Sequence, residues 1–311
     1  MSYICVDRGR EKCPCLLMEA GQCYTCGMIK TGKCDCPAGW QGVCPYTEYI
    51  QNGKKIKELR RRQWFPIAEK KSFSKELKLA VLQVPAGFAL KCKTMGTFLM
   101  IEAAGYKIPL SVMKSEIKGN MGNIHLAFYV TGPKTMALEK MWKDGEPWCV
   151  TGPFYNGLTN SEAFVPDALS VVLAKGVAAM PLINQENRIW GDLAEMFLDK
   201  RKLPSEFLKD YMDDIEYESV DLEEDLDDVV EQVLVSREYC LRTTGKKPNV
   251  FLMVSPYYVE EILKKACLPR EDFIYPNHSN MCCGEGICGA CAHTDGAGDT
   301  VRGCKCNGMK V

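Results

Sequence analysis

The distribution of cysteine constrains this chain more than any other feature. Of its 18 cysteines, fourteen lie in the first 50 and the last 30 residues. Residues 1–50 are dense in Cys, Gly and short polar residues, so they have too few apolar side chains to fold without cross-links or bound metal. From Met281 onward Gly and Cys dominate in the same way. We therefore expect metal at both ends of the chain and apolar cores in the middle.

Disulfides are the competing explanation for so many cysteines. They persist in oxidising compartments, which a chain reaches by export. The start MSYICVDRGREKCPC carries charges where an export signal needs an apolar run. No run of about 18 apolar residues suggests a membrane span either. We therefore expect a cytoplasmic protein whose clustered thiols bind metal. A net charge of −1 gives it no general attraction to nucleic acid or anionic lipid.

The N-terminal thiols are spaced as candidate metal ligands. Seven of them lie within 32 residues, and Cys5 stands slightly apart. The spacing leaves two alternatives, which are one [4Fe–4S] cluster with spare thiols or two zinc ions. The seven candidates are Cys13, Cys15, Cys23, Cys26, Cys34, Cys36 and Cys44.

The C-terminal thiols have a more specific spacing. Cys283, Cys288, Cys291 and Cys304 follow the pattern C-x4-C-x2-C-x12-C, and its first three positions match the plant-type [2Fe–2S] spacing. The glycines between them permit the positive φ angles that backbone wrapped around a cluster requires. Zinc prefers paired knuckles, and only one such pair is present, so we predict a [2Fe–2S] cluster. Cys304 is the preferred fourth ligand, although Cys306 also qualifies.

The middle of the chain predicts a β region followed by an α/β region. Short runs rich in β-branched and aromatic residues predict an antiparallel barrel or sandwich over residues 65–160. After Pro166, the runs DALSVVLA and NVFLMVS are continuously apolar, as in strands covered on both faces. A helical pattern follows the second run, which predicts a small layer of parallel strands and helices. The basic stretch from Lys54 to Gln63 is interpreted as a solvated helix that links two domains.

The cluster motif MCCGEGICGAC comes after three segments of the middle, IPLSV, FYVTGPKTMALEKMWKDGE and GPFYNG. In this order they resemble the electron-transfer subunit of class 1B dihydroorotate dehydrogenase, which carries FAD and a [2Fe–2S] cluster. The small subunits of sulfide dehydrogenase and of bifurcating ferredoxin:NADP oxidoreductases are similar. All belong to the ferredoxin–NADP reductase superfamily, and the resemblance covers residues 65–311.

The resemblance implies an FAD site on the barrel. The three segments correspond to the family's Arg-Pro-x-Ser motif, its strand and Gly-Thr-x-x-Leu helix, and its Gly-Pro-x-Gly-Asn-Gly loop. A Ser hydroxyl on a strand can hydrogen-bond the flavin ring, and a helix start can bind a pyrophosphate. Ile108 stands where the family has Arg, so Lys107 or Lys134 would have to replace a phosphate-binding charge. The implied residues are Pro109, Ser111, Thr135, Gly152, Asn156 and Gly157.

The expected nucleotide-binding layer departs further from the family. The family places a Gly-Gly-x-Gly-x-x-Pro turn after the first strand, where the pyrophosphate of a nicotinamide dinucleotide meets a helix start. Here AKGVAAMP supplies only Gly176 and the proline. The resemblance therefore implies weakened NAD(P) binding at Gly176, with Lys175 as a candidate phosphate partner.

These features predict a multidomain protein of α/β and all-β parts. Residues 1–50 are the Cys-rich metal-binding segment and 51–165 an antiparallel FAD-binding barrel. Residues 166–280 are a small parallel α/β domain that resembles an NAD(P)-binding domain, and 281–311 are the [2Fe–2S] segment.

The predicted function is a redox relay within an oxidoreductase complex. Electrons pass between NAD(P)H or a partner cluster, FAD and the [2Fe–2S] cluster, and on to a larger catalytic subunit or a ferredoxin. This context favours an iron–sulfur cluster over zinc at the N-terminal thiols. No acid–base catalytic set is visible among the three scattered histidines. The alternative is a non-catalytic assembly or scaffold subunit with structural metals and a decayed flavin or nucleotide site.

Overall fold

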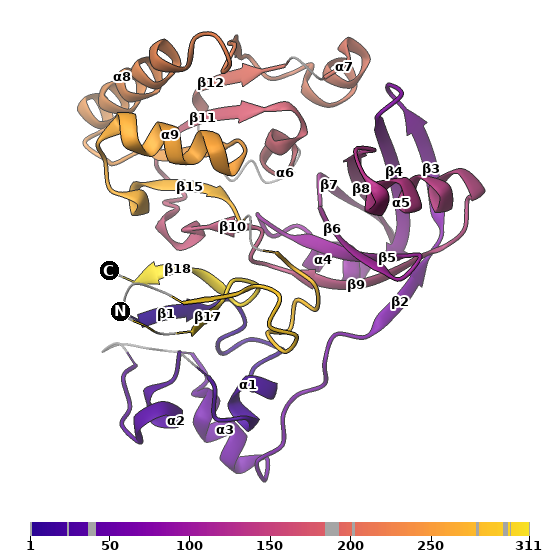
Figure 1. Cartoon of the computed structure of the whole chain (residues 1–311), viewed down its shortest axis with the longest axis vertical. Coiled ribbons are helices and arrows are strands. Elements are labelled where there is room, and N and C mark those ends of the chain that lie inside the picture. The colour runs from indigo at the N-terminus through magenta and orange to yellow at the C-terminus, as the bar shows by residue number, and fades with distance from the viewer. Residues whose placement is uncertain are drawn as a thin grey trace. The chain divides into compact units, whose positions relative to one another are not determined.

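The chain divides into two units that do not follow its linear order (Figure 1). A computed structural model describes residues 2–23, 25–36, 42–183, 193–200, 203–277, 280–294, 298 and 300–310. Unit 1 combines Met1–Arg62 with Ser279–Val311, and unit 2 is Gln63–His278. The two cysteine-rich ends, predicted as separate segments, therefore fold in one unit. The division of the chain at residues 50, 165 and 280 stays a prediction.

Unit 2 begins with two four-stranded antiparallel sheets, ordered β2-β9-β5-β6 and β3-β4-β8-β7. In β8, buried and half-buried residues alternate, as expected when one face of a strand covers a core. That core contains Leu82, Ile101 and Trp148, which are fully buried. The strands are β2 Arg62–Phe65, β3 Ile67–Ser72, β4 Leu77–Pro85, β5 Phe98–Ala103, β6 Tyr106–Ser111, β7 Lys114–Lys118, β8 Met121–Tyr129 and β9 Trp148–Phe154, with helices α4 Ala86–Lys91 and α5 Pro133–Asp144.

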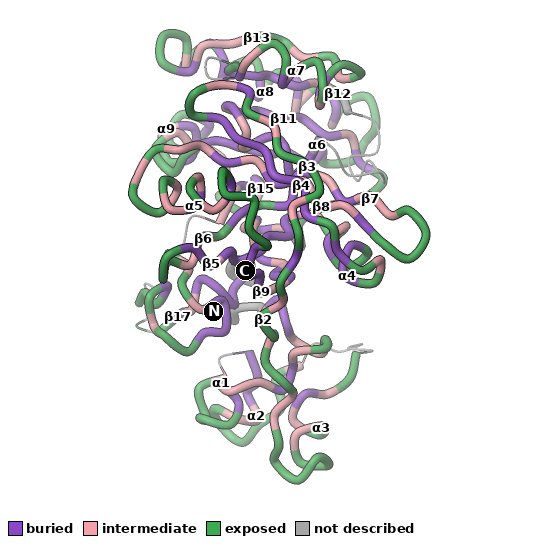
Figure 2. Tube along the Cα trace, turned by 90° about the vertical axis from the view of Figure 1, so that its right-hand side faces the viewer, coloured by how far each residue is buried: buried purple, intermediate pink, exposed green. Residues whose placement is uncertain are grey.

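The second half of unit 2 is a six-stranded sheet ordered β10-β15-β14-β11-β12-β13, parallel except for the pairing of β10 with β15. β11 (Figure 2) and β14 are buried along almost their whole length because both faces are covered. Val171 and Leu173 pack with α8 and α9, whereas Val172 and Ala174 pack with α7 and barrel residues. The strands are β10 Leu158–Thr159, β11 Ser170–Lys175, β12 Leu193–Asp199, β13 Glu218–Ser219, β14 Asn249–Met253 and β15 Phe273–Pro276; the helices are η1 Ser161–Ala163, η2 Gly176–Ala179, α6 Met180–Ile183, α7 Ser205–Met212, α8 Leu226–Thr244, α9 Pro256–Ala266 and η3 Arg270–Asp272.

Unit 1 has short elements and a small apolar core. Its buried apolar cluster is Leu17, Val301 and Cys306, with Cys15 packed against it. Strand β1 pairs antiparallel with β18, and β16 with β17, so the first and last segments of the chain share a sheet. The elements are β1 Ser2–Cys5, α1 Leu16–Glu19, α2 Gly27–Thr31, α3 Pro45–Gln51, β16 Ala292–Thr294, β17 Thr300–Arg302 and β18 Cys306–Lys310.

The predicted fold class is confirmed by the antiparallel sheets and the parallel α/β layer. The predicted linker helix over Lys54–Gln63 is wrong. Helix α3 ends at Gln51, residues 55–61 form no regular element and β2 begins at Arg62. The run of charges predicts solvated side chains, yet the Arg60 side chain is only 3% exposed. Within the described ranges, no helix combines the length and the apolar character needed to cross a bilayer.

Candidate functional site

Unit 2 contains a pocket of about 610 Å³ between its barrel and the carboxyl ends of β11 and β14. This volume lies within the range typical of small-molecule and cofactor sites. Strand β6, the end of β8 and the start of α5 form one side, and the segments that follow β11 and β14 form the other. Four of the residues implied by the resemblance line this pocket, namely Pro109, Ser111, Thr135 and Gly157.

Close backbone packing fixes the loop that carries Gly157. A Cβ at this position would lie 2.4 Å from the carbonyl oxygen of Gly96, so no larger residue fits. The Gly157 N–H donates to that carbonyl at 2.9 Å, and the Asn277 N–H donates to the Gly157 carbonyl at 2.8 Å. Backbone hydrogen bonds to Gly96 and to Asn277 therefore hold this loop in place.

The Thr135 hydroxyl is already engaged at the start of α5. It accepts the N–H groups of Thr131 at 2.9 Å and Gly132 at 3.2 Å. Thr135 therefore stabilises the start of this helix. A phosphate bound here would be held by backbone N–H groups, because the Thr135 hydroxyl is already engaged. Neither Lys134 nor Lys107 is among the lining residues, whereas Ile108, 5% exposed, is.

The other implied residues, Gly152, Asn156 and Gly176, are not among those that line the pocket. Asn156 is fully buried next to Gly157, and its carbonyl accepts a hydrogen bond from the Asn277 side chain at 3.0 Å. Gly152 packs against Leu99 inside the barrel. Gly176 has a φ of +59°, and a Cβ there would lie 3.6 Å from the hydroxyl of Tyr129, which lines the pocket.

Lys175 lines the pocket but is paired with carboxylates. Its Nζ lies 2.6 Å from Asp199 Oδ2 and 3.3 Å from Glu223 Oε1. Burial is the largest single influence and lowers the pKa of Lys175, but the hydrogen bonds and charge attraction of Asp199 and Glu223 together outweigh it, so the pKa is raised. Lys175 therefore stays charged, and a phosphate has to compete with the buried Asp199 carboxylate for it.

In unit 1, the loop from Cys283 to Cys291 gathers the C-terminal thiols. Cys304 hydrogen-bonds to both Cys283 and Cys291, and Cys283 also contacts Cys288. Gly284, Gly286 and Gly289 in this loop all have positive φ, between 68° and 75°. The four predicted [2Fe–2S] ligands thus meet in one place. Cys306 instead belongs to the apolar cluster with Leu17 and Val301, and Cys282 is exposed.

The loop also favours the thiolate form that metal binding requires. A hydrogen bond from the Cys304 thiol, with backbone N–H groups of Cys288, Glu285 and Ile287, lowers the pKa of Cys283 to about 3. The Glu285 N–H reaches Cys283 Sγ at 3.3 Å. A hydrogen bond from Cys304 likewise lowers the pKa of Cys291 to about 6. All 18 cysteines are free thiols, so the sulfur set and its N–H donors fit an iron–sulfur cluster.

The thiols are gathered but not yet arranged as ligands. Among the residues that the structure describes, no three His, Cys, Asp or Glu side chains stand in ligating geometry. Binding of a metal therefore requires cysteine side chains to rotate towards it.

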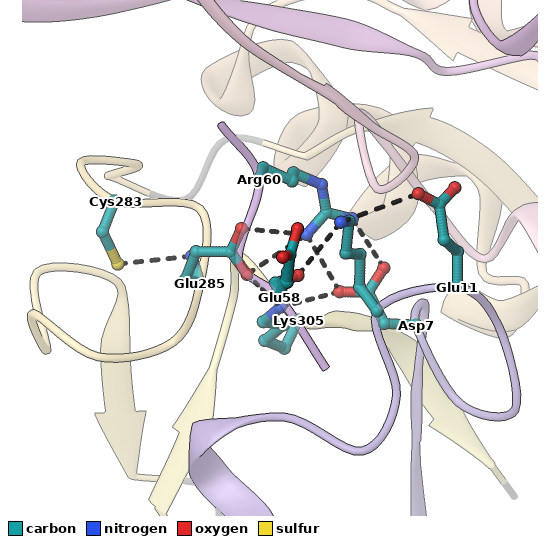
Figure 3. Close-up of polar contacts among 8 residues, drawn as sticks. Asp7, Glu11, Glu58, Arg60, Cys283, Glu285 and Lys305 are labelled. Atoms are coloured by element: carbon teal, nitrogen blue, oxygen red, sulfur yellow. Dashed lines mark hydrogen bonds and ion pairs between the residues drawn. The ribbon is translucent and has the colours of Figure 1, made fainter. Parts of the chain in front are cut away.

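A buried network of four charged side chains supports this loop (Figure 3). The Lys305 ammonium lies 2.7 Å from Asp7 and 2.9 Å from Glu285, and the Arg60 guanidinium lies 2.7 Å from Asp7 and 3.1 Å from Glu285. Lys305 is fully buried, and the other three side chains are at most 10% exposed. Burial opposes ionisation, but Lys305 and Arg60 lower the pKa of Asp7 to about 2. This ionic network was not predicted from the sequence.

Comparison with known proteins identifies the fold. No protein-family profile matches the sequence, and no curated protein matches it significantly. Among solved structures, the NADH-dependent reduced ferredoxin–NADP oxidoreductase of flavin-based electron bifurcation matches with a TM-score of 0.55 and 19% identity, over 80% of this chain and 86% of that one. Phthalate dioxygenase reductase, described as a modular structure for electron transfer from pyridine nucleotides to [2Fe–2S], matches with a TM-score of 0.52 and 11% identity, over 79% and 96%.

The chain has a ferredoxin–NADP reductase-type fold. At these identities the likeness concerns the arrangement of the elements. This confirms the predicted barrel and α/β layer of the reductase fold. The narrower resemblance to the dihydroorotate dehydrogenase subunit stays a prediction.

The N-terminal thiols are distributed over unit 1 and not gathered at one point. Cys34 hydrogen-bonds to Cys36, and the sulfur of Cys36 accepts a hydrogen bond from the Arg8 guanidinium at 2.9 Å. Cys44 precedes α3 and accepts a hydrogen bond from Thr47. Cys26 precedes α2 and is buried. The remaining members of the predicted set, Cys13, Cys15 and Cys23, line a separate small cavity together with Cys5.

Proposed function

We propose that this chain is a flavin and iron–sulfur electron-transfer subunit of an oxidoreductase complex. The observation that carries the proposal is the presence, in one reductase fold, of a pocket walled by Pro109, Ser111 and Gly157 and of four contacting thiols at Cys283, Cys288, Cys291 and Cys304. Its proposed partners are a larger catalytic subunit or a ferredoxin, as in the dihydroorotate dehydrogenase and sulfide dehydrogenase assemblies.

The pocket residues would hold FAD. When bound, FAD accepts electrons in pairs and releases them singly, and a [2Fe–2S] cluster carries one electron at a time. The Ser111 hydroxyl would hydrogen-bond the flavin ring, and the backbone at the start of α5 would meet the pyrophosphate. Ile108 and Leu110 would exclude water from one side of the site. Cys283, Cys288, Cys291 and Cys304 would hold the cluster.

The direct test is cofactor analysis of the full chain. Protein purified anaerobically and supplied with FAD, iron and sulfide is expected to bind one flavin and one [2Fe–2S] cluster. Ser111→Ala is expected to weaken FAD binding about 5- to 10-fold, since a hydrogen bond is worth about 1 kcal/mol. Ser219→Ala, on exposed β13, is the control and should bind FAD normally. A chain that stays free of flavin in excess FAD would contradict the proposal.

The scaffold alternative is favoured by one observation, the engagement of Lys175 by Asp199. It predicts no nucleotide-driven chemistry. Mixing the FAD-loaded chain with NADH or NADPH in an anaerobic stopped-flow instrument tests for this chemistry. Bleaching of the flavin by either nucleotide supports the relay. Absence of bleaching by both, with FAD bound, leaves the flavin fed only through partner clusters or unused in a scaffold.

A further inference from the structure

Four of the eight N-terminal thiols surround one small cavity in unit 1. The cavity has a volume of about 20 Å³, and its wall also includes Asp7, Arg8, Leu17, Met18 and Thr25. The four thiols are Cys5, Cys13, Cys15 and Cys23.

The fold places these four sulfurs near one another. Cys5 lies close enough to Cys15, and Cys13 close enough to Cys15 and Cys23, for these thiols to repel one another when ionised. Cys5 reaches the cavity because β1 pairs with β18, in a register that sets it opposite Cys306. From the sequence alone Cys5 stood apart from the other thiols, so this strand pairing is what adds it to the group.

The size of the cavity favours a single ion. A cavity needs a volume of roughly 10–15 Å³ to hold one water-sized sphere. The space of about 20 Å³ between the sulfurs therefore admits one atom and not the iron and sulfide atoms of a [4Fe–4S] cluster. Leu17 and Met18, 6% and 3% exposed, keep one side of it dry.

We propose that Cys5, Cys13, Cys15 and Cys23 bind one zinc ion as a closed structural site. Four thiolates at ~2.3 Å around one ion are a standard structural zinc site. The thiols line the cavity without yet standing in ligating geometry, so they would turn inward about their Cα–Cβ bonds. The Arg8 guanidinium in the wall would offset part of the negative charge of the zinc–thiolate group. The site does not depend on the proposed flavin or [2Fe–2S] cluster, and it departs from the iron–sulfur preference drawn from the sequence.

The test is the zinc content of the full chain and of single variants, measured with iron and acid-labile sulfide. Each of Cys5→Ser, Cys13→Ser, Cys15→Ser and Cys23→Ser is expected to lose about one zinc equivalent relative to the unchanged chain. Cys92→Ser and Cys240→Ser, both buried in unit 2, are the controls and should keep it.

A second measurement uses the unchanged chain and so does not depend on how the variants fold. Co²⁺ added to the metal-free chain is expected to give the visible bands of tetrahedral thiolate coordination, and Zn²⁺ is expected to remove them by displacing Co²⁺. Zinc kept in the four variants, zinc lost in Cys92→Ser or Cys240→Ser, no such bands from the unchanged chain, or iron and sulfide lost in place of zinc would each overturn the proposal. Cys288→Ser reports on the [2Fe–2S] cluster separately, because it should remove iron and sulfide and leave this zinc.

Discussion

At the scale of single residues, the pairing of Lys175 with Asp199 decides how much positive charge the pocket presents at the end of β11. Lys175 supplies a cation at the end of β11, but Asp199, 1% exposed, holds it at 2.6 Å. Ile108 supplies no charge on the opposite side. A phosphate that enters the pocket would therefore be bound through its fit and through backbone N–H groups, because the charge of Lys175 is already paired with Asp199.

We expect Asp199→Asn to strengthen nucleotide binding. Asn keeps the shape of Asp and still accepts the Leu222 N–H, which lies 3.3 Å from Oδ2, but it no longer holds the charge of Lys175. One charge-assisted hydrogen bond is worth about 1.5–3 kcal/mol, or roughly 10-fold or more in affinity. The NADH or NADPH concentration for half-maximal flavin bleaching should fall accordingly. Asp228→Asn, exposed on α8, is the matched control, and an equal response of the two variants would contradict the expectation.

His125 makes the stability of unit 2 depend on pH. It is largely buried in β8, with Nδ1 3.2 Å from the Tyr211 hydroxyl and Nε2 3.5 Å from Glu116. Burial lowers the pKa of His125 below 6.5, against the attraction of Glu116 and Glu69 and with the help of Lys114. The unfolded chain therefore binds more protons than the folded chain just below pH 6.5, and stability falls as the pH drops through that value towards the folded pKa.

The free energy of unfolding of unit 2 is thus expected to decrease between about pH 7.5 and about pH 5.5. His125→Gln should flatten this part of the profile because glutamine does not titrate. Urea unfolding followed by far-UV circular dichroism at both pH values measures the change. The same slope in the variant would show that other groups cause it.

At the scale of elements, the reductase layers were readable from the sequence because their burial is local. The unbroken apolar runs of β11 and β14 predict strands covered on both faces, and both faces are covered. The pairing of β1 with β18 was not readable, because no local pattern specifies a partner at the other end of the chain. The prediction for Lys54–Gln63 is wrong because a run of Lys and Arg by itself predicts solvated side chains. Only the tertiary structure brings Asp7 and Glu285 to Arg60 as buried partners.

In the candidate site, too, part of the arrangement follows from local sequence and part depends on tertiary structure. The C-x4-C-x2-C spacing predicts that Cys283, Cys288 and Cys291 lie close together, and in the structure Cys283 contacts Cys288 while both Cys283 and Cys291 hydrogen-bond to Cys304; their role as ligands stays a prediction. The choice between Cys304 and Cys306 depended on where β18 begins. Cys306 is its first residue and points into the apolar cluster, whereas Cys304 precedes it and contacts the loop thiols.

Cys304→Ser is therefore expected to lose most of the [2Fe–2S] cluster, and Cys306→Ser to keep it. Serine exchanges a soft sulfur ligand for a hard oxygen, which iron–sulfur clusters tolerate poorly. Visible absorption and the EPR signal of the reduced protein, normalised to iron content, report the outcome. Equal loss in both variants, or loss in Cys306→Ser alone, would reverse the assignment.

At the scale of the whole molecule, unit 1 is built from the two ends of the chain, which share one sheet, one buried ionic network and a small apolar cluster. Asp7 and Lys305, 298 positions apart, are joined at 2.7 Å inside it. The small cluster of Leu17, Val301 and Cys306 supplies little apolar burial. Residues 1–50 by themselves therefore lack both β18 and three of the four members of the ionic network, Arg60, Glu285 and Lys305.

We expect Arg60→Met to destabilise unit 1 while leaving unit 2 intact. The variant leaves Asp7 and Glu285 buried against Lys305 alone, and removing one partner from a buried ion pair costs about 3–5 kcal/mol. Glu285 sits inside the thiol loop and its N–H reaches Cys283, so the [2Fe–2S] signal should fall with the stability of unit 1. Limited proteolysis with mapped cleavage sites is expected to cut residues 1–62 and 279–311 first.

The neighbouring arginine is the matched control for this test. Arg61 is 76% exposed and pairs with Glu58 at the surface, where an ion pair is worth at most about 1 kcal/mol. Arg61→Met should therefore keep both the cluster signal and the protease resistance of unit 1. Equal behaviour of the two variants would show that the buried network does not hold the ends together. Loss of FAD binding in Arg60→Met would show that the two units do not fold independently.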